Sequence, residues 1–149
     1  MKKGFLSLAL FMAMATVIPA SAFAHESSTV TSQHDDDFVV FKLYVDGKYT
    51  LPTHGPYKGE DENPFTWDKA DGTQIRFFIK DIDQMGMSIS IIDSNGNPVS
   101  GANGSTNKNN GYQFLKVVTL PNEGDYIAKV WSDNGDGGYE YEIAVRAIN

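Results

Sequence analysis

The sequence contains no cysteine in its 149 residues. Disulfide frameworks and thiol chemistry are therefore excluded, and the folded domain must be held together by packing. Histidine is nearly as scarce, with His25 and His34 in a polar stretch and His54 in a stretch rich in proline and glycine. Nucleophilic catalysis needs a base beside its nucleophile, and the chain has no Gly-x-Ser-x-Gly motif. We therefore expect a protein that is not an enzyme.

Long apolar runs are confined to the start of the chain. Two lysines precede the apolar run 5–18, which is followed by Pro19 and by small residues. These are the three regions of a secretory signal peptide, and the run is too short to favour a membrane span. Cleavage is expected after Ala24, which makes residues 1–24 the signal peptide, or after Ala22. The mature protein is expected to be secreted and extracellular, without membrane insertion.

Positive charge is also in short supply. The chain has 12 basic and 19 acidic residues, and the signal peptide holds two of the lysines, so the mature balance is 10 − 19 = −9. A negative field of this size repels nucleic acid and anionic lipid headgroups. We expect no nucleic-acid partner. The short signal with its paired lysines and the lack of cysteine favour a bacterial source.

Residues 25–37 read HESSTVTSQHDDD and are polar throughout. A segment of this composition has too little apolar surface to order itself, so it is expected to be a disordered tail. Residues 38–149 are long enough for one domain with its own core, and they show neither an internal repeat nor a second domain.

From residue 38 onward, apolar and polar residues alternate with the period of two that is typical of strands, and no stretch has the period of a helix. Asp46-Gly47 predicts a hairpin turn, and residues 52–64 and 101–111 are expected to be loops. The expected strands are residues 38–46, 49–51, 65–67, 74–80, 85–93, 112–120, 126–132 and 139–147. About seven or eight short strands predict an all-β fold, a two-layer antiparallel β-sandwich that is jelly-roll-like.

The last two expected strands are joined by the turn sequence DNGDGG, and together they predict an antiparallel hairpin with one buried face. Tyr126, Ala128 and Val130 share a face of the first of these strands, which leaves Trp131 on the opposite face. Trp131 is there either exposed as a contact site or packed, if both faces of the strand are covered. The strand at 112–120 has apolar residues on both faces, so either register is open.

Several of these segments resemble the bacterial pre-peptidase C-terminal (PPC-like) domains. The matching stretches are Gly72–Ile75, Asp93–Gly96, Gly124–Val130 and Gly138–Ile143, and the likeness covers about two thirds of the mature chain. The resemblance implies a secreted sandwich that binds carbohydrate or protein, as such domains do beside secreted enzymes. Some members of this family bind calcium.

Aromatic residues give the candidate ligand contacts. Trp67 and Trp131, with Tyr141 among seven tyrosines, are candidates for a platform on which sugar rings stack. The lead hypothesis is a non-catalytic protein that binds an extracellular or cell-surface ligand, most simply a glycan. The alternative is a secreted inhibitor or interaction protein that uses loop 52–64 against a protein partner such as a protease. The oligomeric state is left open.

A calcium loop is suggested by Asp93-x-Asn95-x-Asn97, but the sixth position is Pro98 and the twelfth is Gly104, so the EF-hand reading fails. Four other aspartates in turns are candidates for a looser structural calcium site. They are Asp81, Asp83, Asp133 and Asp136. No other cofactor is expected, although an N-terminal His25 would be able to chelate copper if cleavage follows Ala24.

Overall fold

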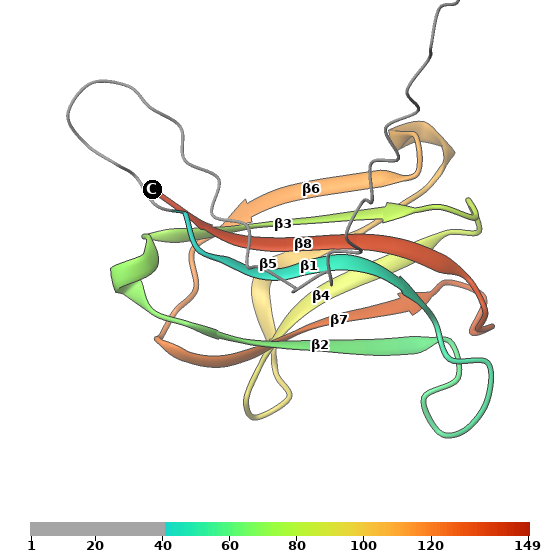
Figure 1. The fold of residues 1–149 in the computed structure, drawn as a ribbon, viewed down its shortest axis with the longest axis horizontal. Coiled ribbons are helices and arrows are strands. Elements are labelled where there is room, and N and C mark those ends of the chain that lie inside the picture. The colour runs from blue at the N-terminus through green and yellow to red at the C-terminus, as the bar shows by residue number, and fades with distance from the viewer. Residues whose placement is uncertain (1–40) are drawn as a thin grey trace, which may run out of the picture.

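The computed structural model describes residues 41–149, and it shows two four-stranded antiparallel sheets packed face to face (Figure 1). The predicted signal peptide, the tail at 25–37 and residues 38–40 of the first expected strand lie outside the described residues. The strands are β1 (Leu43–Thr50), β2 (Glu60–Trp67), β3 (Gln74–Asp81), β4 (Met87–Asp93), β5 (Pro98–Ser105), β6 (Gln113–Val118), β7 (Gly124–Ser132) and β8 (Glu140–Ile148). Two short 3-10 helices, η1 (Lys69–Asp71) and η2 (Lys108–Asn110), complete the elements. Within residues 41–149 there is no helix with the length and apolarity to cross a membrane.

The strand order is β1-β8-β3-β6 in one sheet, called sheet A here, and β2-β7-β4-β5 in the other, called sheet B. The chain therefore pairs β1 with β8, β2 with β7, β3 with β6 and β4 with β5. This nested pairing is a long hairpin wrapped into two layers, which is the jelly-roll arrangement. The predicted fold class is confirmed. β1 and β2 form the edges on one side of the sandwich and β5 and β6 form those on the other.

The core lies between the sheets and is built by alternation. Ile75, Phe77 and Ile79 of β3 are fully buried, as are Met87 and Ile89 of β4. The alternating residues of β3 and Ser88 of β4 are partly exposed, whereas Ser90 of β4 is buried. The predicted faces of both strands are therefore confirmed, and period-two sequence is what specifies the core.

The predicted closing hairpin is wrong. β7 belongs to sheet B and β8 belongs to sheet A, so the two strands face each other across the core instead of pairing side by side. Each strand has one buried and one outward face in either arrangement, which is why alternation did not distinguish them. Residues 133–138 are long enough to cross the roughly 10 Å between packed sheets.

The turn predicted at Asp46-Gly47 is also wrong, because β1 runs through it to Thr50 while pairing with β8. The return strand expected at 49–51 is the continuation of β1 and the residue after it. Gly47 serves packing here: a Cβ at this position would lie 2.8 Å from the ring of Tyr49. An Asp-Gly pair marks a hairpin only where the flanking residues pair with each other.

Two predicted loops are partly strands. The loop expected at 52–64 ends at Gly59, since β2 begins at Glu60, and the first part of the loop expected at 101–111, residues 101–105, belongs to β5. Both are edge strands, where charged residues, Pro64 and glycines are tolerated because one side of the strand needs no ladder partner. Gly104 is also required by packing, since a Cβ there would lie 2.1 Å from the ring of Phe114. Phe114 faces inward, which settles the register of β6.

Replacing Phe77 by alanine tests the core assignment. Phe77 is completely buried, so Phe77→Ala is expected to lower the free energy of unfolding by about 3–5 kcal/mol through lost transfer energy and a cavity. Phe78→Ala is the matched control, because its side chain points outward on the same strand. Urea denaturation of both variants measures the difference, and equal losses would contradict the assigned faces.

Candidate functional site

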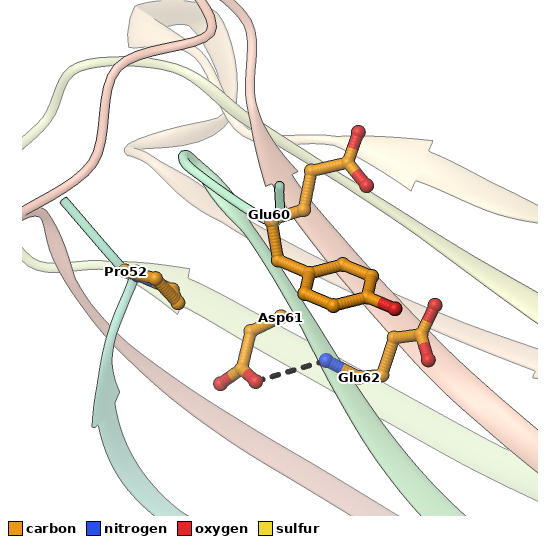
Figure 2. Close-up of a pocket in the computed structure, with 5 residues that line it drawn as sticks. Pro52, Glu60, Asp61 and Glu62 are labelled. Carbon is orange, nitrogen blue, oxygen red and sulfur yellow. Dashed lines mark hydrogen bonds between the residues drawn. The ribbon is translucent and has the colours of Figure 1, made fainter. Parts of the chain in front are cut away.

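The largest concentration of exposed tyrosine and carboxylate lies where the edges β1 and β2 meet. Two adjoining hollows of about 350 and 370 Å³ share Asp61 and Glu62, and together they are called the edge cleft here. The first is lined by Pro52, Tyr57, Glu60, Asp61 and Glu62 (Figure 2). The second is lined by Tyr44, Val45, Asp46, Tyr49, Asp61, Glu62, Asn63 and Pro64.

The alternation of β2 divides its three acidic residues between two sides of the strand. Glu60 and Glu62 extend to one side, whereas Asp61 extends to the other, toward Pro52 (Figure 2). The Asp61 Oδ1 atom accepts a hydrogen bond of 2.9 Å from the backbone N–H of Glu62. Glu60 is paired with Lys129 on the outer surface of sheet B. Glu62 is exposed and has no ion pair among residues 41–149.

A buried tyrosine lies behind the cleft and holds Asp61, which lines it. The hydroxyl of Tyr141, on β8 of sheet A, donates a 2.6 Å hydrogen bond to Asp61 Oδ2 on β2 of sheet B. Asn63 Nδ2 donates to the same hydroxyl at 3.1 Å and to the Ala128 carbonyl oxygen at 3.3 Å. Burial, and then the Asp61 carboxylate, raise the pKa of Tyr141 well above its usual value. The hydroxyl therefore stays protonated and keeps its donor role.

Two tyrosine rings are open to solvent at the cleft. Tyr57 is 61% exposed, and Tyr49 is 38% exposed with its ring centroid 5.8 Å from that of Tyr141. A tyrosine ring offers a rigid apolar surface with a polar hydroxyl, so both rings are candidate contacts for a ligand in the cleft. The cleft thus combines flat apolar surfaces with carboxylates that accept hydrogen bonds.

The loop that carries Tyr57, residues 52–59, is anchored at both of its ends. Gly59 donates a backbone hydrogen bond to the Pro52 carbonyl oxygen, and Lys58 forms a 2.8 Å ion pair with Asp136 of the loop between β7 and β8. A Cβ on Gly137 would lie 1.7 Å from the Pro52 carbonyl oxygen, so only glycine fits where the two loops touch. These contacts present Tyr57 in a fixed place.

The predicted ligand contacts fall in different environments. Trp67 is 1% exposed and Tyr141 is 0% exposed, so both belong to the core and neither is available to a ligand on the surface. Their apolar bulk is needed between the sheets. Trp131 points outward as predicted, is partly exposed, and lies directly opposite Glu60 in the β2–β7 ladder. It therefore borders the edge cleft. Sequence reasoning missed Tyr49 and Tyr57 as individual contacts, although the 52–64 segment that it selected contains Tyr57.

The four candidate calcium ligands are not brought together. Across residues 41–149 no group of three or more histidine, aspartate or glutamate side chains is placed to hold a metal ion. Asp81 accepts backbone hydrogen bonds from Gln84 and Gly86. The other three accept hydrogen bonds from separate donors: Asp83 from the backbone of Glu140, Asp133 from Ser88 and Asp136 from Lys58.

Asp93 caps the turn that resembled a calcium loop. Its Oδ1 atom accepts hydrogen bonds of 2.9 and 2.8 Å from the backbone N–H groups of Asn95 and Asn97, and these bonds hold the pKa of Asp93 below its usual value. His25 and His34, on which a copper site would depend, lie outside the described residues. His54 is exposed, and its Nδ1 atom lies 2.6 Å from the Thr53 hydroxyl.

Comparison of the chain with known protein-family models, with curated proteins and with solved structures found no match. The likeness to PPC-like domains therefore stays a prediction.

Removing the Tyr141 hydroxyl tests whether its hydrogen bond to Asp61 stabilises the fold. Tyr141→Phe keeps the ring in the core but deletes the donor to Asp61, so the free energy of unfolding is expected to fall by about 1–3 kcal/mol. Tyr49→Phe is the matched control, because the Tyr49 ring is partly in solvent, and it is expected to change stability by less than about 0.5 kcal/mol. Equal losses of unfolding free energy for the two variants in urea denaturation would show that the hydrogen bond to Asp61 does not stabilise the fold.

Proposed function

We propose that this protein is a secreted, non-catalytic binding module that recognises an extracellular or cell-surface glycan through the edge cleft. The observation that carries the proposal is the exposed Tyr57 ring beside the carboxylates of Glu60, Asp61 and Glu62 in one open hollow. Secretion rests on the signal-peptide pattern of residues 1–24.

The chemistry of a sugar ring fits this pairing. Each ring has an apolar face of C–H groups and a rim of hydroxyl groups. A tyrosine ring offers a rigid apolar surface for the face, while an ionised carboxylate accepts hydrogen bonds from hydroxyls more strongly than a neutral acceptor does. Glu62, which is exposed and without an ion pair among the described residues, is the best placed acceptor.

The charge of the cleft restricts the kind of glycan. Asp46, Glu60, Asp61 and Glu62 all line it. Like-charge contacts select against a wrong partner by several kcal/mol at close range, on the order of the values seen at protein interfaces. We therefore infer that neutral sugars, or sugars with an amino group, are preferred over uronic or sulfated ones.

A protein partner, such as a protease, is the second candidate. It is favoured by the fixed loop 52–59, which presents Tyr57 to solvent, because an ordered loop loses little entropy when it docks. Addition of a strand to the edge of β2 is less suitable, since Pro64 and three acidic residues occupy that edge.

Retention on insoluble glycans tests the lead proposal. The mature protein is expected to be retained on at least one of cellulose, chitin and bacterial cell wall, and to be released by the matching soluble oligosaccharide. Tyr57→Ala and Glu62→Gln are each expected to weaken retention about tenfold, which corresponds to about 1.4 kcal/mol of binding free energy. Trp131→Ala is expected to have a smaller effect, because Trp131 lies beside Glu60 and only borders the cleft.

The matched control is Leu115→Ala, which removes an exposed apolar side chain from the outer face of sheet A and should leave retention unchanged. Addition of EDTA tests whether a metal ion takes part in binding. Unchanged retention would agree with the finding that Asp81, Asp83, Asp133 and Asp136 accept hydrogen bonds from different donors. Absence of retention on every matrix would contradict the glycan proposal, and binding to a panel of purified proteases would then be the test of the second candidate.

A further inference from the structure

A second surface of opposite character lies on the outer face of sheet A. A hollow of about 340 Å³ is lined by side chains from all four strands of this sheet. They are Leu43, Asp46, Arg76, Phe78, Leu115, Ala144 and Arg146. This set is called the arginine face here. Arg76 and Arg146 alternate with the buried Phe77 and Val145, so this face points away from sheet B.

Arg76 and Arg146 are the only arginines in the chain, and they are direct cross-strand partners on β3 and β8. Both are partly exposed. Neither forms an ion pair among residues 41–149, whereas Lys48 and Lys80 on the same sheet are paired with Glu140 and Glu142. The two guanidinium groups are therefore available together at one place.

Such a pair is unfavourable for the fold alone. Like charges directly opposite each other on neighbouring strands are destabilising. Glu142 lies opposite both Lys48 and Lys80 in the ladders of this sheet, whereas Arg76 lies opposite Arg146. A binding role explains why two positive charges stand side by side in a chain whose net charge is −7.

The surroundings of the pair are apolar. Leu115 is 56% exposed, and Val117, the β6 neighbour of Arg76 in the ladder, is 39% exposed. Phe78 and Ala144 continue the apolar surface across β3 and β8. Exposed aliphatic and aromatic side chains around arginine are typical of protein–protein interfaces. When a partner covers them, water is excluded and the ionic hydrogen bonds at the centre become stronger.

We infer that the arginine face is a docking surface for a segment of a partner protein that bears a carboxylate between apolar side chains. The two guanidinium groups donate hydrogen bonds to the oxygens of one carboxylate, and the flanking apolar groups of the segment cover Leu115 and Phe78.

Polyanions are poorer occupants. Nucleic acid, sulfated glycans and anionic membranes need extended positive surface, whereas here Asp46 lines the hollow and Glu140 and Glu142 lie along β8 of the same sheet. The net charge of −7 repels a long anion, whereas a single carboxylate interacts mainly with the two nearby arginines.

Selection from a displayed library of random 12-residue peptides tests the inference. The full-length mature protein is the bait, and Arg76→Gln/Arg146→Gln is the counter-selection. We expect enriched peptides with Asp or Glu flanked by Leu, Ile or Phe. Synthetic versions should bind the wild type at least tenfold more tightly than the double variant, and replacing their acid by the amide should cause the same loss.

Lys69→Gln/Lys108→Gln is the matched control, since it removes two positive charges from exposed positions in η1 and η2 and should leave peptide binding unchanged. The arginine variant is expected to unfold at the same temperature as the wild type or a higher one, because a like-charge pair is removed. Selection that yields no peptide dependent on the arginines overturns the inference.

Two further outcomes identify other occupants and also overturn it. Binding of heparin or of vesicles with anionic lipid that depends on the arginines would assign the face to a polyanion. Peptide binding that appears only after Asp35, Asp36 and Asp37 are replaced by Asn would assign it to the acidic run of the chain itself. Retention on glycans is independent of these variants, so this inference and the proposed function fail separately.

Discussion

The hydrogen bond from the Tyr141 hydroxyl to Asp61 is the contact on which the cleft depends. It joins β8 of one sheet to β2 of the other at the side where both sheets end, and Asn63 completes it with a second donor. Because this contact fixes β2, it also fixes the positions of Glu60 and Glu62 on the opposite side of the strand. A buried residue therefore determines the geometry of an exposed site.

The fold was largely predictable from the sequence, and the site was not. Period-two alternation identified the strands with strong buried faces, such as β3 with Ile75, Phe77 and Ile79, because one face of each must be apolar. It failed at the edge strands β2 and β5, whose polar and glycine-rich residues have no such requirement. It also could not tell whether β7 pairs with β8 or faces it, since both arrangements bury the same side chains.

Alternation also could not show which large aromatic residues are exposed and which fill the core. Aromatic type suggested Trp67 and Tyr141, but a jelly roll with no disulfide uses its large rings to fill the space between the sheets, and both are buried. Tyr57 is exposed because two loops that are distant in sequence are joined by backbone contacts at Pro52 and Gly137. No local pattern encodes that contact. The acidic, tyrosine-bearing edge and the hollow around Arg76 and Arg146 adjoin at Asp46, which lines both.

Chemical-shift mapping by NMR tests most directly whether a glycan binds in the edge cleft. The protein, labelled with ¹⁵N, is titrated with the soluble oligosaccharide that releases it from the retaining matrix. If the sugar binds in the edge cleft, the largest shifts are expected on the backbone amides of Tyr49, Tyr57 and residues 60–63, with a smaller shift of the Trp131 indole. Shifts that are centred on Arg76 and Arg146, or no shifts at saturating sugar, would contradict it.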